Sequence, residues 1–199
     1  MKRILLLSFI AALLLLDIAA CKKKTPDPNG NGNGNGNGTN LFTLASSAMV
    51  EGGFMPRAFT CDTSFKVFPP LSWSNAPAGT MYYALFMDNI DYDNVATKSK
   101  FCHWVLFNLL STTNKIDKGI NLSYPIPDDS TLIGTNDNNG VQYGTPCPAT
   151  TVTNNYKFTL YALSARCNLK LQATKAQVIK EIANKTLGTA TLTVKYTGK

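Results

Sequence analysis

The sequence predicts a mainly β domain in which antiparallel sheets pack face to face as a β-sandwich-like body, with one helix at the periphery. Residues 101–108 carry apolar side chains on both alternating faces, which predicts a strand covered on both sides and therefore inside a sheet. Residues 189–196 alternate between Thr or Lys and apolar side chains, as a half-exposed strand does. Helical spacing of apolar residues is clear over residues 174–186.

The first residues of the chain predict export and lipid anchoring. Residues 1–3 are Met-Lys-Arg, and the apolar run 4–16 is too short to cross a bilayer as a stable helix. Residues 18–20 (Ile-Ala-Ala) precede Cys21 and resemble a bacterial lipobox. We therefore expect a signal peptide at 1–20 and acyl chains on Cys21 that hold the protein in the bacterial cell envelope, at the outer membrane or the periplasmic face. The alternative is a plain secretory signal with an incidental cysteine.

A spacer is expected between this signal and a single domain. Residues 21–40 hold three lysines and five Asn-Gly pairs, a composition that cannot bury a core, so the domain is expected at 41–199. The whole chain has a net charge of +7, and 41–199 keeps 14 basic and 10 acidic residues. Those basic residues are scattered without aromatic interleaving, so no nucleic-acid partner is expected.

The strands of the domain can be assigned in chain order. The expected strands are 42–44, 54–59, 80–88, 101–108, 156–163 and 189–196. A further strand is expected to begin with residues 69–73. The prolines of 69–73 confine that strand to an edge or an entry point. Alternation places Asp88 on the same face as Ala84 and Phe86. Residues 75–79 form a turn cluster, and the mostly loop segment 111–153 is long enough to suggest a functional surface.

The expected helix over 174–186 begins with a capping box. Thr174 and Gln177 have the required three-residue spacing. The apolar residues that repeat at helical spacing are Ala176, Ile179, Ile182 and Ala183.

His103 is the only histidine of the chain and lies within 101–108. Simple alternation puts it on one face with Phe101, Val105 and Phe107, and puts Trp104 and Leu106 on the other. The imidazole is then either a satisfied core residue or the polar point of a pocket.

Six sequence blocks occur in a recognisable order. They are CD (61–62), PPLSWSNAPAGT (69–80), MDNID (87–91), HWVLFN (103–108), YGTPCP (143–148) and YKFTLYAL (156–163). Together they resemble the phosphatidylethanolamine-binding protein (PEBP) family, in its bacterial, Raf kinase inhibitor-like branch. The resemblance covers nearly all of 41–199. It implies the PEBP fold, with a small anion pocket at one end that takes phosphate, acetate or a phospholipid headgroup.

The resemblance also implies a set of ligand-binding residues. They are Asp88, His103, Tyr143, Thr145, Pro146, Cys147, Pro148, Asn154 and Tyr156. Backbone N–H groups of the 145–148 loop and the imidazole can donate to an oxyanion. Asp88 can fix the imidazole tautomer or bind a cationic amine.

This sequence departs from the family pattern at several pocket positions. Thr145 stands where Gly is common, Ala149 replaces a second proline, and Asn154-Asn155 replaces the His-Arg pair before Tyr156. Where the family has the run DPDAP, this sequence has Asp88-Asn-Ile-Asp-Tyr. We therefore expect the fold to survive, with weaker or altered anion affinity.

Four cysteines remain besides Cys21. They are Cys61, Cys102, Cys147 and Cys167. An even number in an exported chain favours disulfides and allows three pairings. The resemblance implies the pair Cys61–Cys147, because those two blocks tend to carry cysteine together in relatives. No CxxC or HxxxH spacing exists, so no metal site is expected.

Enzymatic chemistry is not expected from these motifs. The chain has no GxSxG and no P-loop, and Cys102 should point away from the face of its neighbour His103. Asp88 and Asp91 could form an acid–base pair, although Asp91 is expected in a solvated loop. No catalytic residue and no cofactor are therefore expected. The predicted function is a membrane-anchored binding protein for a small anion or phospholipid headgroup. The alternatives are a protein-interaction or inhibitor module with a vestigial pocket, or an envelope hydrolase.

Overall fold

The computed structural model describes residues 41–64, 67–96, 99–120 and 130–199. Residues Thr39–Lys199 group as one compact unit. The predictions of a signal peptide at 1–20, a lipidated Cys21 and a spacer at 21–40 lie outside the described residues. Within the described ranges, no helix combines the length and the apolar character needed to span a membrane.

The centre of the domain is a five-stranded antiparallel sheet. Its strands, in spatial order, are β10 (Thr186–Thr197), β9 (Thr153–Leu163), β4 (Tyr82–Asn94), β5 (Ser99–Leu110) and β8 (Leu132–Ile133). β5 pairs with β4 on one side and with β8 on the other, so residues 101–108 lie inside the sheet as predicted. The buried residues Ala190, Leu192, Val194 and Tyr196 alternate along β10, which confirms the half-exposed C-terminal strand.

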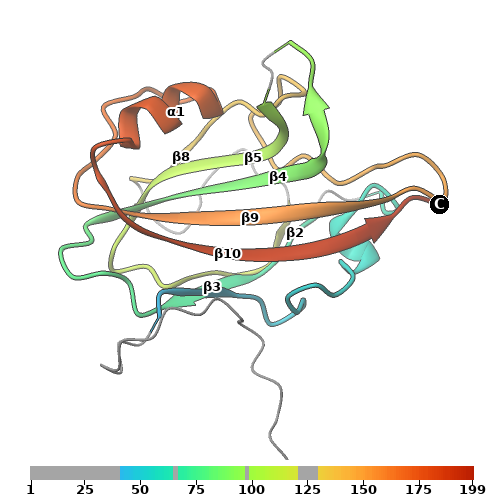
Figure 1. The fold of residues 1–199 in the computed structure, drawn as a ribbon, viewed down its shortest axis with the longest axis horizontal. Coiled ribbons are helices and arrows are strands. Elements are labelled where there is room, and N and C mark those ends of the chain that lie inside the picture. Colours follow the sequence, from blue (N-terminus) through green and yellow to red (C-terminus); the bar gives the residue numbers. More distant parts are fainter. Residues whose placement is uncertain (1–40, 65–66, 97–98, 121–129) are drawn as a thin grey trace, which may run out of the picture. The chain divides into compact units, whose positions relative to one another are not determined.

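A second antiparallel sheet packs against one face of the central sheet. It contains β1 (Thr43–Ala45), β3 (Leu71–Ser74) and β6 (Lys115–Ile116), and a further pair joins β2 (Val67–Phe68) to β7 (Gly119–Ile120). Leu106 of β5 and Trp73 of β3 belong to the apolar core between these sheets. Figure 1 shows β3 on one side of the central sheet and the helix α1 on the other. The predicted mainly β fold with face-to-face antiparallel sheets is confirmed.

The helix α1 (Lys175–Ile182) covers the opposite face of the central sheet. Thr174 is its N-cap, and the predicted capping box with Gln177 is present. Val178 and Ile182 are buried in an apolar cluster with Phe107 of β5. Burial of such a side chain stabilises the fold by about 1.5–3 kcal/mol.

Two details of the helix prediction are wrong. The helix ends at Ile182 rather than at 186, because the chain turns there to enter β10 at Thr186. Ala176 and Ala183 are exposed, and Val178 takes the place on the apolar face that was assigned to them. The reason is that the larger β-branched side chain gains more from burial than an alanine does.

Two further predictions need correction. Residues 54–59 contain no strand but an isolated bridge at Phe54 and the 3-10 helix η1 (Arg57–Phe59), which begins after Pro56. β4 runs on to Asn94, so Asp91 is on a strand and not in a loop. The described parts of the segment 111–153 are mostly loop, as predicted, and contain the short strands β6, β7 and β8; residues 121–129 lie outside the described residues.

Two register shifts between β4 and β5 change which side chains of β5 lie on each face of the sheet. Met87 and Asp88 of β4 pair with Trp104 and Cys102, so His103 is an extra residue, as in a β-bulge. Asn108 is a second extra residue and has a positive φ of 63°.

The bulges overturn the predicted division of faces. Val105 and Phe107 lie with Cys102 in the cluster beneath α1, whereas Trp104 and Leu106 lie in the core on the other face. His103 therefore does not share a face with Val105 and Phe107, because one inserted residue reverses the alternation that follows it.

Candidate ligand-binding site

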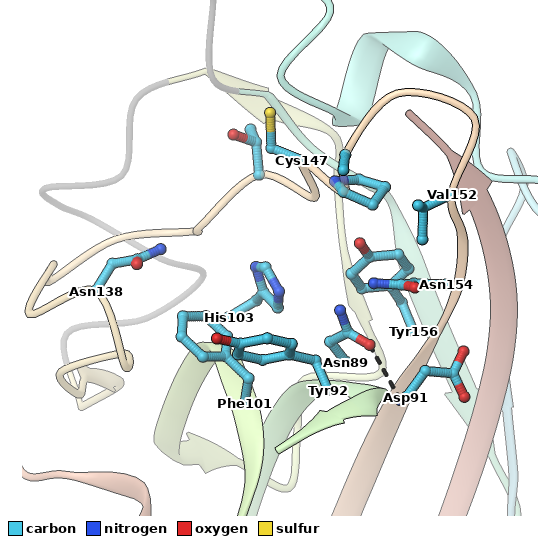
Figure 2. A pocket seen from close by; sticks show the side chains of 13 residues that line it. Asn89, Asp91, Tyr92, Phe101, His103, Asn138, Cys147, Val152, Asn154 and Tyr156 are labelled. Atoms are coloured by element: carbon cyan, nitrogen blue, oxygen red, sulfur yellow. Dashed lines mark hydrogen bonds between the residues drawn. The ribbon is translucent and has the colours of Figure 1, made fainter. Parts of the chain in front are cut away.

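A pocket of about 670 Å³ lies at the end of the central sheet where β4 and β5 project beyond the core. It is lined by side chains from those strands, from the start of β9 and from the loop that follows Tyr143. Figure 2 shows His103 with Tyr92 and Phe101 on one side and Cys147 on the other. The volume falls within the range that small-molecule sites occupy.

His103 is buried in the wall of this pocket, with 6% of its surface exposed. Its Nδ1 lies 3.0 Å from the carbonyl oxygen of Gly144. A carbonyl oxygen only accepts, so Nδ1 carries the hydrogen and Nε2 of the neutral ring is left as an acceptor. Burial lowers the pKa of His103 to about 4, and the hydrogen bond to Gly144 only partly opposes this. The ring is therefore neutral at pH 7.

Gly144 and Asn136 hold the backbone of His103 in place. The N–H of Gly144 donates to the carbonyl of His103 over 2.8 Å, and Nδ2 of Asn136 donates to the same oxygen over 3.3 Å. A Cβ atom at position 144 would lie 2.9 Å from that oxygen. Only glycine therefore permits this approach of the loop to β5.

A disulfide fixes the loop that closes the pocket. Cys61 and Cys147 are bonded, as the family resemblance implied, and the N–H of Cys61 donates to the carbonyl of Pro146 over 3.0 Å. The hydroxyl of Tyr143 donates to the carbonyl of Phe59 over 2.9 Å. The loop is thus attached at three points to the segment around η1. The other two candidates for a disulfide, Cys102 and Cys167, are buried free thiols.

The predicted ligand-binding residues divide into those that line the pocket and those that do not. His103, Thr145, Cys147, Pro148, Asn154 and Tyr156 line it. Tyr143 is fully buried, with its ring packed edge-on against Trp104 at 5.3 Å, and Pro146 is buried next to it. Those two residues support the loop from behind instead of facing the cavity.

The position of Asp88 is the main difference between the predicted site and the observed pocket. It does not line the pocket, and its carboxylate forms an ion pair of 2.7 Å with Lys175 at the start of α1. Asp88 thus lies on the side of the sheet that α1 covers, directly after the register shift between Met87 and Asp88. Burial raises the pKa of Asp88, and Lys175 partly counteracts the effect. Asp88 therefore cannot orient the imidazole or contact a ligand beside it.

Several lining residues were missed by the sequence-based prediction. They are Asn89, Asp91, Tyr92, Phe101, Asn138, Ala149 and Val152. Phe101 lies two residues before His103, and that spacing was a signal for a shared face. Asp91 and Tyr92 could not be assigned, because β4 was expected to stop at 88. Oδ2 of Asp91 accepts from the backbone and side chain of Asn155, at 2.6 Å and 2.7 Å, which joins the extension of β4 to β9.

Comparison with known families identifies this arrangement. The family model described as phosphatidylethanolamine-binding protein matches residues 45–197, most of the domain. This chain belongs to the PEBP family. The predicted family membership is therefore confirmed.

Two relatives resemble the chain over most of its domain. A UPF0098 protein of Methanothermobacter thermautotrophicus is 32% identical over 149 residues, which cover 75% of this chain and 94% of the relative. LppC of Mycobacterium tuberculosis, which is named as a lipoprotein, is 32% identical over 159 residues, or 78% of this chain and 72% of LppC.

Solved structures show the same fold. A PEBP homologue from Chlamydia trachomatis superposes with a TM-score of 0.70 at 24% identity and covers 80% of this chain and 99% of its own. YbcL of E. coli, described as a member of the mammalian PEBP family, gives a TM-score of 0.70 at 21% identity. The superposition covers 79% of this chain and 99% of YbcL.

Three of the departures from the PEBP pattern lie in the pocket wall. Thr145, Ala149 and Asn154 all line it. Among the described lining residues none is Lys or Arg, and Asp91 is the one carboxylate. Within the part of the chain that the structure describes, no group of three His, Cys, Asp or Glu side chains is placed to hold a metal ion. The donors that remain for a ligand are neutral, and this favours the expectation of altered anion affinity, which stays a prediction.

Proposed function

We propose that this PEBP-family protein is a binding protein that holds a phosphorylated headgroup, or a small anion of the same chemistry, in the pocket beside His103. The observation that carries the proposal is the cavity of about 670 Å³ with a buried, oriented imidazole in its wall. Sites that bind small ligands combine a concave pocket of this size with a few fixed polar groups.

Neutral donors would hold the phosphate. Asn138, Thr145, Asn154 and Tyr156 bring amide and hydroxyl groups to the cavity wall. Hydrogen bonds from such groups to an anion are charge-assisted and stronger than neutral pairs, and each contributes about 1.5–3 kcal/mol. Binding without a lysine or arginine is expected to be modest in affinity and to depend on several of these contacts together.

The site favours binding over catalysis. Nucleophilic catalysis needs a base against a hydroxyl or thiol. Cys147 is in the disulfide, and Cys102 lies in the cluster beneath α1, away from the pocket. The His103 ring is hydrogen-bonded to the Gly144 carbonyl and, among the described residues, to no hydroxyl, so neither Thr145 nor Tyr156 is held against a base. We infer that the protein retains its ligand without converting it.

The lipobox-like residues before Cys21 and the relative named as a lipoprotein support a lipid-anchored location in the bacterial envelope. Headgroups of membrane phospholipids would then be within reach of the pocket. Mass spectrometry of the purified protein should find a diacylglyceryl-modified Cys21 at the N-terminus. An unmodified Cys21 would contradict the anchor.

The binding proposal is tested by calorimetry on the full chain in detergent, with phosphate, glycerol phosphate and phosphoethanolamine. Ala149→Trp places a large ring in the cavity and should weaken binding at least tenfold. Ala183→Trp, an equal change at an exposed position at the end of α1, should leave the isotherms unchanged.

Identical isotherms for both variants would place binding elsewhere and refute the proposal. Absence of binding by every phosphorylated compound would favour the second candidate, a protein-interaction module with a vestigial pocket. The loss of positive charge from the pocket wall supports that candidate.

A further inference from the structure

The end of the domain opposite the pocket exposes apolar side chains beside the residue where the chain enters the domain. We propose that this end, formed by Leu41, Met81, Leu187 and the turn 75–79, rests on the surface of the bilayer that holds the lipid anchor. The partner is therefore a membrane surface, and the inference goes beyond the proposed binding function. It depends on the anchor expected at Cys21 and not on the ligand of the pocket.

Strand pairing places Met81 and Leu187 at the same end of the central sheet. Met81 comes just before β4, and its N–H donates to the carbonyl of Leu163, the last residue of β9, over 2.8 Å. Leu187 is the second residue of β10, which starts opposite Leu163. Figure 1 shows β10 running from there to the C-terminus. A Cβ atom at Gly198, just after β10, would lie 2.4 Å from the carbonyl oxygen of Ala149, which lines the pocket. The two ends of β10 therefore mark opposite ends of the domain.

The turn 75–79 joins Leu41 to the same group of residues. Nδ2 of Asn75 donates to the carbonyl of Leu41 over 3.2 Å. A Cβ atom at Gly79 would lie 3.8 Å from Cδ1 of Leu187, so the turn also contacts the start of β10. The apolar residues thus come from three segments that meet at one end of the sheet.

These apolar side chains remain exposed in the folded domain. Leu41 is 68% exposed, Met81 is 55% exposed and Leu187 is 42% exposed. Exposed apolar residues that gather at one place mark surfaces for a partner or a membrane. Side chains of this kind stabilise a protein at a bilayer by entering the boundary between headgroups and acyl chains.

The charges at this end are compatible with anionic headgroups. The segments that meet here are 41–45, 74–82, 110–114, 163–166 and 184–189, and they contain Arg166 and Lys185 but no Asp or Glu. The opposite end of the domain also exposes an apolar residue, Val95, but Asp91 and Asp93 are close to it on the same extension of β4. Carboxylates are repelled by the negative surface of such membranes, and lysine and arginine are attracted. Charge therefore favours the end with Leu41.

Chain connectivity favours the same end. Cys21 and Leu41 are 20 residues apart in sequence. A Gly-rich chain of that length spans about 25 Å on average. β10 has 12 residues and a length of about 40 Å. The end that contains Leu41 is therefore held closer to an anchored lipid than the pocket is, which raises its effective concentration at the bilayer.

Docking at this end has a consequence for the pocket. While the domain rests on Leu41, Met81 and Leu187, the pocket opens away from the bilayer that holds the anchor. Headgroups of that bilayer would reach the pocket when the domain leaves the surface. The contact would thus control how often the pocket meets its own membrane.

The experiment uses the full lipidated chain in vesicles of phosphatidylcholine and phosphatidylglycerol that carry bromine on the acyl chains. Met81→Trp and Val95→Trp each place an indole at an exposed position, one at either end of the domain. Apolar side chains at an interface enter it by about 5–10 Å, so bromine should quench the added fluorescence of Met81→Trp at least about twofold more than that of Val95→Trp. The wild type, with the buried Trp73 and Trp104, supplies the background.

A second pair of variants assigns the quenching to the apolar residues. Leu41→Ser with Leu187→Ser, added to Met81→Trp, should remove the excess quenching. Val50→Ser with Phe54→Ser makes a matched change at two other exposed apolar positions, beside the C-terminal part of β10, and should leave the quenching as it is.

Equal quenching of the two tryptophans would overturn the proposal, because the domain would then have no preferred orientation. Stronger quenching of Val95→Trp would overturn it by placing the pocket end on the bilayer. Excess quenching that survives Leu41→Ser with Leu187→Ser would also contradict it. If the chain does not stay with the vesicles on flotation, the anchor and this inference fail together, whereas calorimetry still decides the binding function.

Discussion

His103 combines burial, a fixed tautomer and a position at a β-bulge. The extra residue in β5 turns the imidazole toward the end of the sheet, and Gly144 then accepts from Nδ1. In the neutral ring Nε2 is left as a hydrogen-bond acceptor. The same burial makes its protonation unfavourable in the folded state.

The stability of the protein should therefore depend on pH through His103. The pKa is lowered from 6.5 to about 4 in the folded state, so the unfolded chain binds the proton more readily. Its contribution to stability is complete above pH 6.5 and is lost as pH falls toward 4. We expect the free energy of unfolding to fall by about 3 kcal/mol more in the wild type than in His103→Asn between pH 7 and pH 4.

Denaturant titrations of both proteins at the two pH values measure this difference. Asn keeps an amide donor for the Gly144 carbonyl but has no titrating group, so it is the matched control. Parallel loss of stability in the two proteins would show that His103 is protonated as easily in the folded chain as in the unfolded one.

Asn108 is the second residue whose conformation the fold requires. Its φ of 63° lies in the left-handed region that Asn tolerates better than most residues. Its side chain accepts from the N–H of Cys167 at 2.8 Å and donates to the carbonyl of the same residue at 3.1 Å. These two bonds attach β5 to the chain that leads into α1.

At the scale of elements, the ion pair between Asp88 and Lys175 connects α1 to β4. The side chains are 14% and 21% exposed, and the ammonium group also lies 5.9 Å from the Phe86 ring. A carboxylate taken out of water in this way depends on its partner, and burial raises its pKa even so.

Removing one partner should have unequal effects. Lys175→Met should destabilise the protein by about 2 kcal/mol, because it leaves a buried carboxylate unpaired. Asp88→Asn should cost less, since the long lysine side chain can move its charge into solvent. Thermal or denaturant unfolding of both single variants and of the double variant measures the pair. A larger loss for Asp88→Asn than for Lys175→Met would contradict this account.

The sequence anticipated the elements whose evidence is local. The alternation in β10, the capping box of α1 and the apolar character of β5 all depend on neighbouring residues in the chain, and each was found. The length of β4 was missed, because its end is paired with Lys100 and Ser99 across a hairpin and contains Asn and Asp, which are rare in strands.

At the scale of the whole molecule, the disulfide between Cys61 and Cys147 connects segments separated by 86 residues in sequence. It holds the loop of the pocket against the segment around η1. Closing so long a loop restricts the unfolded chain, which stabilises the folded state by about 4–5 kcal/mol in the chain-entropy description.

Reduction should therefore lower the melting temperature and weaken ligand binding together. The double variant Cys61→Ser/Cys147→Ser should melt lower than the wild type, and calorimetry should show a weaker affinity for phosphoethanolamine. Reductant should change the wild type but not the double variant, because Cys102 and Cys167 are already free thiols. A wild type that is insensitive to reductant would contradict a structural role for this bond.

The sequence by itself determined the β class, the helix cap and, through its resemblance to the PEBP family, the disulfide and six of the thirteen described residues of the pocket wall. Only the tertiary structure decided that His103 is an inserted residue, that Asp88 pairs with Lys175, and that Asp91 and Tyr92 reach the cavity. Periodicity reports which face a side chain takes within one strand. A bulge arises from the register of two strands, and an ion pair between residues 87 positions apart arises from packing, so neither is encoded in the local pattern.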